Sequence, residues 1–452
     1  MLLHWCGRNI YTIPAKKTEH SVKRNKMTKK TVLACTACTI GMFILILSSG
    51  CKEKNTTGDT TVASSVDPVF NKVNTSQSGI SFTNMVEENY HRNYFDTFAY
   101  VYNGAGVATA DVNNDGLMDI YFTGNEVPNK LYLNQGGMKF KDITTTANVD
   151  GGKGWDNGVT FVDINSDGFM DIYVCRGGYK DTDEERTNLL FVNNGDLTFK
   201  EEAKKYGLDD KSYSIHAAFF DMDNDGLKDV FVANGIYKDI TDLDYLNFID
   251  NEETKRKIIT QQGVDYKALV DPIPVNPVSN YAFKNKGDLV FTNVIHEWGM
   301  GEAIHSNGSA YGDLNNDGKL DILAVGTTKV SIFRNTTTSP GTISFAGKVD
   351  ITITGWQMRI ADMNGDGKLD IVMGAGYNTG YGTRIYLNNS TGSTINFANA
   401  FTLNTGNYFY GRKMSVGDMN NDGKPDVVSY NNDGVNIFIN TSSSNNLSFN
   451  SS

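Results

Sequence analysis

The chain has 452 residues, with 45 Gly, only 8 Pro, 24 Phe and 22 Tyr, and a formal net charge of −11. Glycine and aromatic residues in these numbers are typical of many short strands joined by turns, and an all-β array of this length can form a single domain. Acidic residues outnumber basic ones, and no basic patch is present that would neutralise phosphates, so nucleic acid is excluded as a partner.

The first recognisable pattern begins at Met27 and predicts an export signal. Lys29 and Lys30 precede an uncharged stretch with the apolar core IGMFILIL, and the stretch ends in LSSGC at Cys51. A basic region, an apolar region and small residues in this order predict a signal peptide over residues 27–50. The LSSGC segment resembles the lipobox of bacterial lipoproteins, which implies that Cys51 is lipidated and begins the mature chain. An uncleaved transmembrane anchor is the alternative interpretation.

The residues around this signal are expected to lie outside the folded domain. Residues 1–26 resemble no targeting region, so we expect an extension upstream of the true start, and the polar residues 51–78 predict a flexible linker. Cys35 and Cys38 form a CxxC pair, but they lie in the apolar signal segment, where a redox or metal role is not expected. Only Cys175 lies further along the chain than Cys51, so no internal disulfide is expected there.

A nine-residue pattern begins at Asp111 and predicts a calcium loop. The segment DVNNDGLMD has oxygen-bearing side chains at positions 1, 3, 5 and 9 and Gly at position 6. Carboxylates held this close repel each other unless a cation lies among them, and oxygen ligands at positions 1, 3 and 5 before a glycine make the first half of a calcium loop. Position 12 is Phe122 rather than the Glu of an EF-hand, and the flanking segments predict strands. We therefore expect Asp119, at position 9, to supply the late carboxylate.

The pattern occurs six times, with starts 52, 58, 92, 49 and 56 residues apart, which indicates a repeat architecture. We expect about six Ca²⁺ ions, one per loop, and a mainly structural role for them, because each would tie two strands together. Nineteen acidic residues lie in the loops, so the acidity of the chain largely reflects these sites. The expected metal ligands are Asp111, Asn113, Asp115 and Asp119; Asp163, Asn165, Asp167 and Asp171; Asp221, Asp223, Asp225 and Asp229; Asp313, Asn315, Asp317 and Asp321; Asp362, Asn364, Asp366 and Asp370; and Asp418, Asn420, Asp422 and Asp426.

Two further strand patterns follow each loop in a constant order. The first ends in Asn, and these residues are Asn134, Asn193, Asn285, Asn335, Asn388 and Asn440. The second is an apolar-x-Phe segment that carries Phe140, Phe199, Phe291, Phe345, Phe397 and Phe449. With the strands before and after the loop, each repeat predicts four strands, and sheets of this size bury their faces by stacking as blades of a β-propeller. Six blades are predicted, with seven as the alternative. A further ISF segment at Ile80–Phe82 predicts that the two ends of the chain share a blade.

The repeats resemble FG-GAP/VCBS repeats, the calcium-binding blades of the integrin α-subunit head, over residues 79–452. The segments GVATADVNNDGLMDIYFTGN and NKLYLNQGGMKFKDIT are most similar to bacterial relatives of cartilage acidic protein. The resemblance implies a calcium-bearing propeller that binds partners, without specifying a ligand. Integrin heads have seven blades, which keeps a degenerate seventh blade open.

We expect ligands on the face opposite the calcium loops, because connections within a blade alternate between the two faces. That face receives the insertion at residues 236–280, which accounts for the 92-residue spacing. Trp rings stack on sugars or anchor protein contacts. The candidate ligand-binding residues are Trp155, Trp298 and Trp356, with His216, Asn307 and Arg412 near the rim. Alternatively, the Trp side chains pack between blades and the insertion is a structural cap over the channel.

Together these features predict a calcium-binding lipoprotein that is exported, anchored to a membrane by its lipid, and located at the bacterial outer membrane or cell surface. We expect a binding or adhesion module for an extracellular glycan or protein. An enzyme needs a convergent acid/base set, whereas the Asp clusters are assigned to calcium, and His296, Glu297 and His305 lack the HExxH spacing. A propeller-based polysaccharide lyase or glycosidase, and a structural scaffold of an outer-membrane complex, are the alternatives.

Overall fold

The computed structural model describes residues 73–87, 104–177, 183–235, 253, 279–287, 289–302, 306–326, 329–353, 355, 357–374, 382–398, 400–403, 413–431, 434–443 and 446–451. The chain divides into two units, Met1–Asn71 and Lys72–Ser452, and every described residue belongs to the second. The predicted signal peptide, Cys51, most of the insertion, His305, Trp356 and Arg412 lie outside the described residues. No helix within the described ranges is long and apolar enough to cross a membrane.

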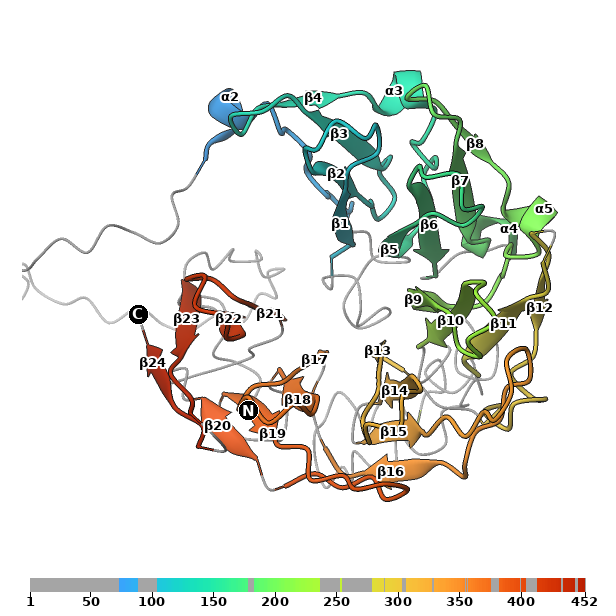
Figure 1. Cartoon of the computed structure of the whole chain (residues 1–452). Coiled ribbons are helices and arrows are strands. Elements are labelled where there is room, and N and C mark those ends of the chain that lie inside the picture. Colours follow the sequence, from blue (N-terminus) through green and yellow to red (C-terminus); the bar gives the residue numbers. More distant parts are fainter. Residues whose placement is uncertain are drawn as a thin grey trace, which may run out of the picture. The chain divides into compact units, whose positions relative to one another are not determined.

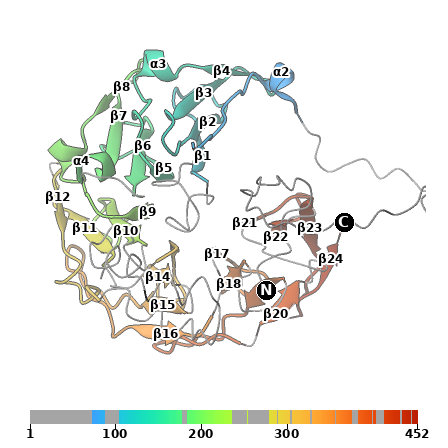
Figure 2. The ribbon, with the colours of Figure 1, turned by 180° about the vertical axis from the view of Figure 1, so that it is seen from behind.

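The second unit is an all-β six-blade β-propeller, which confirms the predicted fold class. The described residues form six sheets, and each sheet contains four consecutive strands of the chain. All neighbouring strands within a sheet are antiparallel. Figure 1 shows the sheets in chain order, and Figure 2 shows the same ribbon from behind.

In each of the first three blades, a short turn joins the third strand to the fourth. The described residues of this part of the chain also contain four short helices. The first blade contains β1 (Val107–Ala110), β2 (Asp119–Phe122), β3 (Lys130–Asn134) and β4 (Phe140–Asp142). The second contains β5 (Asp156–Val162), β6 (Asp171–Arg176), β7 (Leu189–Asn193) and β8 (Phe199–Glu201). The third contains β9 (Ser214–Phe220), β10 (Asp229–Asn234), β11 (Tyr281–Asn285) and β12 (Phe291–Asn293). The helices are α2 (Thr75–Ser78), α3 (Thr144–Ala147), α4 (Asp183–Arg186) and α5 (Ala203–Tyr206).

The last three blades use the same strand order. The fourth blade contains β13 (Gly308–Gly312), β14 (Asp321–Val325), β15 (Val330–Phe333) and β16 (Val349–Ile351). The fifth contains β17 (Met358–Ala361), β18 (Asp370–Met373), β19 (Thr383–Tyr386) and β20 (Phe401–Leu403). The sixth contains β21 (Lys413–Gly417), β22 (Asp426–Asn431), β23 (Gly434–Asn440) and β24 (Phe449–Ser451).

The Asp-rich loops connect the first and second strands of every blade, as predicted. In the first blade, Ala110 pairs with Asp119, so the eight residues between them form the loop of a hairpin. The residue before position 1 pairs with the position-9 Asp in the other five blades as well. The strand register therefore places all six loops at equivalent positions of their blades.

The core lies between neighbouring blades, which explains why a single blade does not suffice to bury its faces. One cluster combines Tyr121 and Leu131 of the first blade with Ile172 and Phe191 of the second. Four further clusters join the second blade to the third, the third to the fourth, the fourth to the fifth and the fifth to the sixth. The first strands of successive blades also contact each other, from β1 with β5 to β17 with β21.

The prediction that the two chain ends share a blade is wrong. The Ile80–Phe82 segment forms no strand, and the sixth sheet takes all four strands from residues 413–451. Phe82 stacks instead on Phe122 of β2, with ring centroids 5.2 Å apart, and the Ser81 N–H donates to the Tyr132 hydroxyl at 3.2 Å. Phe82 therefore packs against the first blade and not in a strand of the sixth.

The predicted fourth strands also need correction in two blades. Phe345 and Phe397 form only isolated bridges, with Asn335 and Asn388 respectively. The fourth strands of these blades, β16 and β20, lie a few residues further along the chain. The connections in these blades are longer, and each Phe packs against the core between its blade and the preceding one.

Candidate metal loops and the opposite face

All six loops adopt the same backbone conformation. Position 4 has a positive φ in every loop, between 57° and 74°, and it is occupied by Asn, Ser or Gly. The glycine at position 6 has φ between 82° and 88°. This left-handed region is accessible to Gly and tolerated by Asn. The conserved spacing within this one chain therefore encodes a specific turn as well as a set of oxygen atoms.

The turn points the side chains at positions 1, 3 and 5 toward each other. In the first loop, Asp111 accepts the N–H of Asp115 through Oδ1 at 3.1 Å and the N–H of Gly116 through Oδ2 at 2.7 Å. Asn113 Oδ1 accepts the same Asp115 N–H at 3.4 Å, so oxygens from positions 1 and 3 converge. The second, third, fifth and sixth loops repeat this convergence. Converging carboxylate and amide oxygens fit the hard-ligand preference of Ca²⁺.

The position-9 aspartates are fully buried in all six loops. Asp171 is fully buried and accepts the N–H of Ile164 at 2.9 Å and that of Asn193 at 2.8 Å. Each oxygen of this carboxylate is therefore bonded to the backbone, and the side chain ties the loop to the third strand. Burial raises the pKa of Asp171 to about 6, against the lowering effect of these two hydrogen bonds. Sequence reasoning assigned this position to the metal alone and missed its role as a strand connector.

The asparagines that end the third strands connect neighbouring blades. Asn388 of the fifth blade donates through Nδ2 to the carbonyl of Leu314, position 2 of the fourth loop, at 2.8 Å. Equivalent bonds join Asn193 to Val112, Asn335 to Met222 and Asn440 to Met363, at 2.9, 2.7 and 2.9 Å. Each of these four asparagines is buried. Four of the six repeated asparagines therefore connect a blade to the loop of the blade before it.

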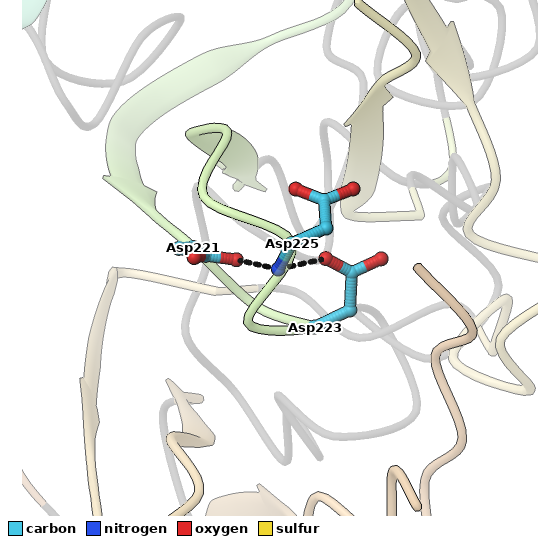
Figure 3. Close-up of side chains that lie close together, drawn as sticks. All are labelled: Asp221, Asp223 and Asp225. Atoms are coloured by element: carbon cyan, nitrogen blue, oxygen red, sulfur yellow. Dashed lines mark hydrogen bonds between the residues drawn. The ribbon is translucent and has the colours of Figure 1, made fainter. Parts of the chain in front are cut away.

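The third loop differs from the others in its charge. It has Asp223 at position 3, where the other five loops have Asn. One oxygen from each of Asp221, Asp223 and Asp225 lies within 4.8 Å of the other two (Figure 3). Lys284 of β11 forms an ion pair with Asp223 Oδ2, and its Nζ lies 3.8 Å from Asp225 Oδ2. Although burial lowers it, the pKa of Lys284 is raised overall by its bond to Asp223 and by the nearby carboxylates. Sequence reasoning missed this lysine.

The two described tryptophans of the opposite face are buried. Trp155 is 3% exposed and forms a bridge with Asn125 of the first blade. Trp298 is 8% exposed and packs between the third and fourth blades, 6.1 Å from the Phe345 ring. Neither ring is available to stack on a ligand in this structure. The proposed ligand role of these two residues is therefore corrected in favour of the alternative, packing between blades.

His216 lies on the inner strand β9 rather than at the rim of the opposite face. It lines a cavity of about 370 Å³, together with Phe161, Tyr311 and the loop residues Met170 and Lys228. Its Nδ1 is 3.2 Å from Ser309 Oγ on β13. Burial, with a smaller contribution from the positive charge of Arg359, lowers the pKa of His216 to about 4. His216 is therefore neutral at physiological pH.

The structure also describes Asn307, His296 and Glu297, which were considered from the sequence as functional residues. Asn307 is half-buried, and its N–H donates to the Val325 carbonyl at 2.6 Å. His296 and Glu297 are exposed in the turn that follows β12. This placement gives them no shared enclosed site.

A second set of asparagines, which sequence reasoning missed, lies before the third strands of the first three blades. Asn129 accepts the Gly124 N–H at 2.8 Å and donates to Asp156 Oδ2 at 2.7 Å. Asp156 in turn pairs with Arg176, whose Nε lies 2.7 Å from its Oδ1 in a buried ion pair. Asn188 and Asn280 make the corresponding bonds to Ser214 and Ser306. These residues connect each of the first three blades to the start of the next one.

Comparison with known protein families identifies the same repeats that the structure shows. The model of the FG-GAP-like repeat matches residues 111–174, 313–373 and 362–429, which include five of the six loops. FG-GAP-like repeats are present in this chain. Cartilage acidic protein 1 is similar over 136 residues, with 31% identity for the Xenopus tropicalis protein and 30% for the Mus musculus protein. The match covers 30% of this chain, which spans only 20% of the length of these relatives.

Two solved structures show a limited similarity to this chain. The Dos1 propeller has 8% identity and a TM-score of 0.36, and the match covers 74% of this chain and 66% of that one. The V. cholerae biofilm matrix protein Bap1 has 13% identity and a TM-score of 0.29, with 73% and 38% covered. At such low identities and TM-scores, neither likeness bears on function.

Proposed function

We propose that this FG-GAP-repeat propeller is an exported, calcium-binding module that binds an extracellular glycan or protein. The observation that carries the proposal is one loop conformation repeated in six blades. In five of these loops, side-chain oxygens of positions 1 and 3 converge on the N–H of position 5. The acidic loops would be filled at the millimolar calcium concentrations found outside cells. Calcium held by the Asp and Asn side chains would fix the first hairpin of each blade.

Export and membrane attachment belong to the same proposal. The pattern of Lys29, Lys30, the apolar core and LSSGC supports a signal peptide and a lipid at Cys51. A lipid-anchored propeller would display its faces to extracellular ligands at a cell surface, such as the bacterial outer membrane. Mass spectrometry of the membrane-derived protein tests the anchor, because a diacylated N-terminal peptide that begins at Cys51 is expected.

The cavity beside His216 on the inner strands is the site that we propose for ligand contact. Its volume, about 370 Å³, lies in the range of small-molecule sites and suits a sugar unit. Tyr311 is 39% exposed and stacks on Phe220, with centroids 4.0 Å apart and an interplanar angle of 10°. The Tyr311 ring, held in place by the buried Phe220, can pack against the apolar face of a sugar ring, and His216 and Lys228 add polar groups beside it.

The test is a binding screen of the purified protein against polysaccharides and host-matrix proteins, with calcium and with EDTA. We expect binding that requires calcium and that falls at least tenfold in Tyr311→Ala. Phe401→Ala is the matched control, because Phe401 is 38% exposed but lies on the outer strand β20. If Tyr311→Ala and Phe401→Ala bind the ligand equally well, the cavity is not the binding site. Depolymerisation of a polysaccharide by the wild-type protein would replace the binding module with an enzyme.

A further inference from the structure

The third loop contains a negative charge that the other loops lack, and this charge is buried. Asp223 is 0% exposed, whereas the equivalent residues of the other loops are neutral asparagines. A buried carboxylate needs a positive partner or hydrogen-bond donors. Exchange of Asn for Asp also removes two N–H donors from position 3. The third loop therefore needs both a positive charge and hydrogen-bond donors from residues outside the loop.

Lys284 supplies both. It stands immediately before the asparagine that ends the third strand, where the other blades have Leu133, Val192, Arg334, Leu387 and Ile439. Its Nζ pairs with Asp223 Oδ2, lies 3.8 Å from Asp225 Oδ2, and donates to the Gly341 carbonyl of the fourth blade at 2.7 Å. The lysine side chain is only 16% exposed. The ammonium is therefore enclosed among acceptors from two blades.

The fourth loop shows what the lysine replaces. There, Asn315 Nδ2 donates to Asp317 Oδ2 at 3.0 Å and to the Gly392 carbonyl of the fifth blade at 2.6 Å. In the third loop, Lys284 faces the two corresponding acceptors, Asp225 Oδ2 and the Gly341 carbonyl. The pair Asp223 and Lys284 thus reproduces the bonds of one asparagine and adds an internal cation.

This internal cation conflicts with a calcium ion in the same loop. Calcium would need oxygens of Asp223 and Asp225 at about 2.3–2.6 Å, and the ammonium is already bonded to one of these carboxylates and close to the other. Two cations that share these carboxylates in a partly buried site would repel each other. The residues of the third loop therefore do not fit calcium as those of the other loops do.

We propose that Lys284 is the resident cation of the third loop, which binds no calcium under conditions that fill the other loops. Its ammonium neutralises the loop carboxylates in place of calcium, and its hydrogen bond to the Gly341 carbonyl connects the third blade to the fourth. The proposal rests on the proposed function, because calcium in the other loops belongs to that function. It lowers the expected number of ions from six to five.

The experiment counts calcium ions per chain by elemental mass spectrometry of the purified protein after equilibrium dialysis against calcium. The wild type is expected to bind one ion fewer than Lys284→Met. The double variant Asp223→Asn with Lys284→Leu recreates the residue pair of the first loop, Asn113 and Leu133, and is also expected to gain one ion. Arg334→Met, at the equivalent position of the fourth blade, is the control and should keep the wild-type number.

The outcomes separate this proposal from the proposed function. If Lys284→Met does not fold, the double variant decides, because it has the side chains of a loop that already occurs in the chain. Equal numbers in the wild type and in the double variant overturn the role of Lys284. If both proteins bind no calcium, the proposed calcium-binding function fails as well. If both bind six ions per chain, only the proposed role of Lys284 is contradicted.

Discussion

Asn388 Nδ2 lies 2.8 Å from the carbonyl oxygen of Leu314, and this bond crosses from the fifth blade to the loop of the fourth. The same Nδ2 donates to Leu369 of its own blade at 2.9 Å, and Oδ1 accepts the Ser390 N–H at 2.9 Å. One side chain therefore holds its own turn, its own loop and the neighbouring loop. Because the asparagine contacts the loop backbone, the stability of a blade junction depends on the order of the loop.

The first prediction concerns this junction. Asn388→Leu is expected to lower the free energy of unfolding by about 2–4 kcal/mol, because it leaves buried backbone groups without partners. Asn134→Leu is the matched control, because Asn134 is only half-buried and donates to Met118 within its own blade. Its expected cost is about 1 kcal/mol. Urea unfolding at constant calcium measures both, and equal losses would contradict a specific role for the contact between blades.

The second prediction concerns calcium removal. Each site filled at about 100 times its Kd adds about 2.7 kcal/mol to the free energy of unfolding. Loss of several such sites is expected to lower the melting temperature by roughly 10 °C or more. Differential scanning calorimetry with calcium and with EDTA measures the shift, and EDTA presaturated with calcium is the control. An unchanged melting temperature would show that the carboxylates of the loops need no metal for the fold.

The repeat pattern made the blades and loops predictable. Asp at positions 1, 5 and 9 with Gly at position 6 recurs so regularly that both the turn and its oxygens can be recognised from one chain. The terminal asparagines were also visible, although their bonds to the preceding blade were not. These bonds join residues about 75 to 115 positions apart, and periodicity within one repeat does not report such contacts.

Other features could not be predicted, for physical reasons that differ. Trp155 suits both a ligand face and the space between blades, and only packing decides between them. His216 was placed by its distance from the loop, but the twist and stacking of the inner strands determine what it faces. For Lys284 a signal was present, since Asp at position 3 and Lys before the terminal Asn occur together only in the third repeat.

The third prediction concerns the buried ion pair between Asp156 and Arg176, which joins the first two strands of the second blade. Arg176→Met leaves Asp156 as a buried carboxylate without its guanidinium, and Asn129 alone does not neutralise it. The expected loss is about 3–5 kcal/mol in the free energy of unfolding. Lys130→Met, which breaks the exposed pair with Asp142, is the control and should cost about 0–1 kcal/mol. Similar losses in the two variants would mean that water reaches the Asp156 pair.

The fourth prediction concerns acid stability and His216. The pKa of His216 is lowered from 6.5 to about 4 in the folded protein, mainly by burial. Between these values the unfolded chain binds a proton that the folded protein does not, so the free energy of unfolding falls as the pH falls. This residue contributes at most about 1.4 kcal/mol per pH unit to that decrease. The stability is fully present above the unfolded pKa and is progressively lost as the pH approaches 4.

His216→Gln should therefore lose less stability than the wild type between about pH 7 and pH 5. Urea midpoints at the two pH values, at saturating calcium, measure the difference. His296→Gln is the control, since His296 is exposed in a turn and both variants retain all six loops. Titration of the loop carboxylates then contributes equally to both proteins and cancels in the comparison. If the two variants lose stability in parallel, the His216 imidazole is solvated in the folded state.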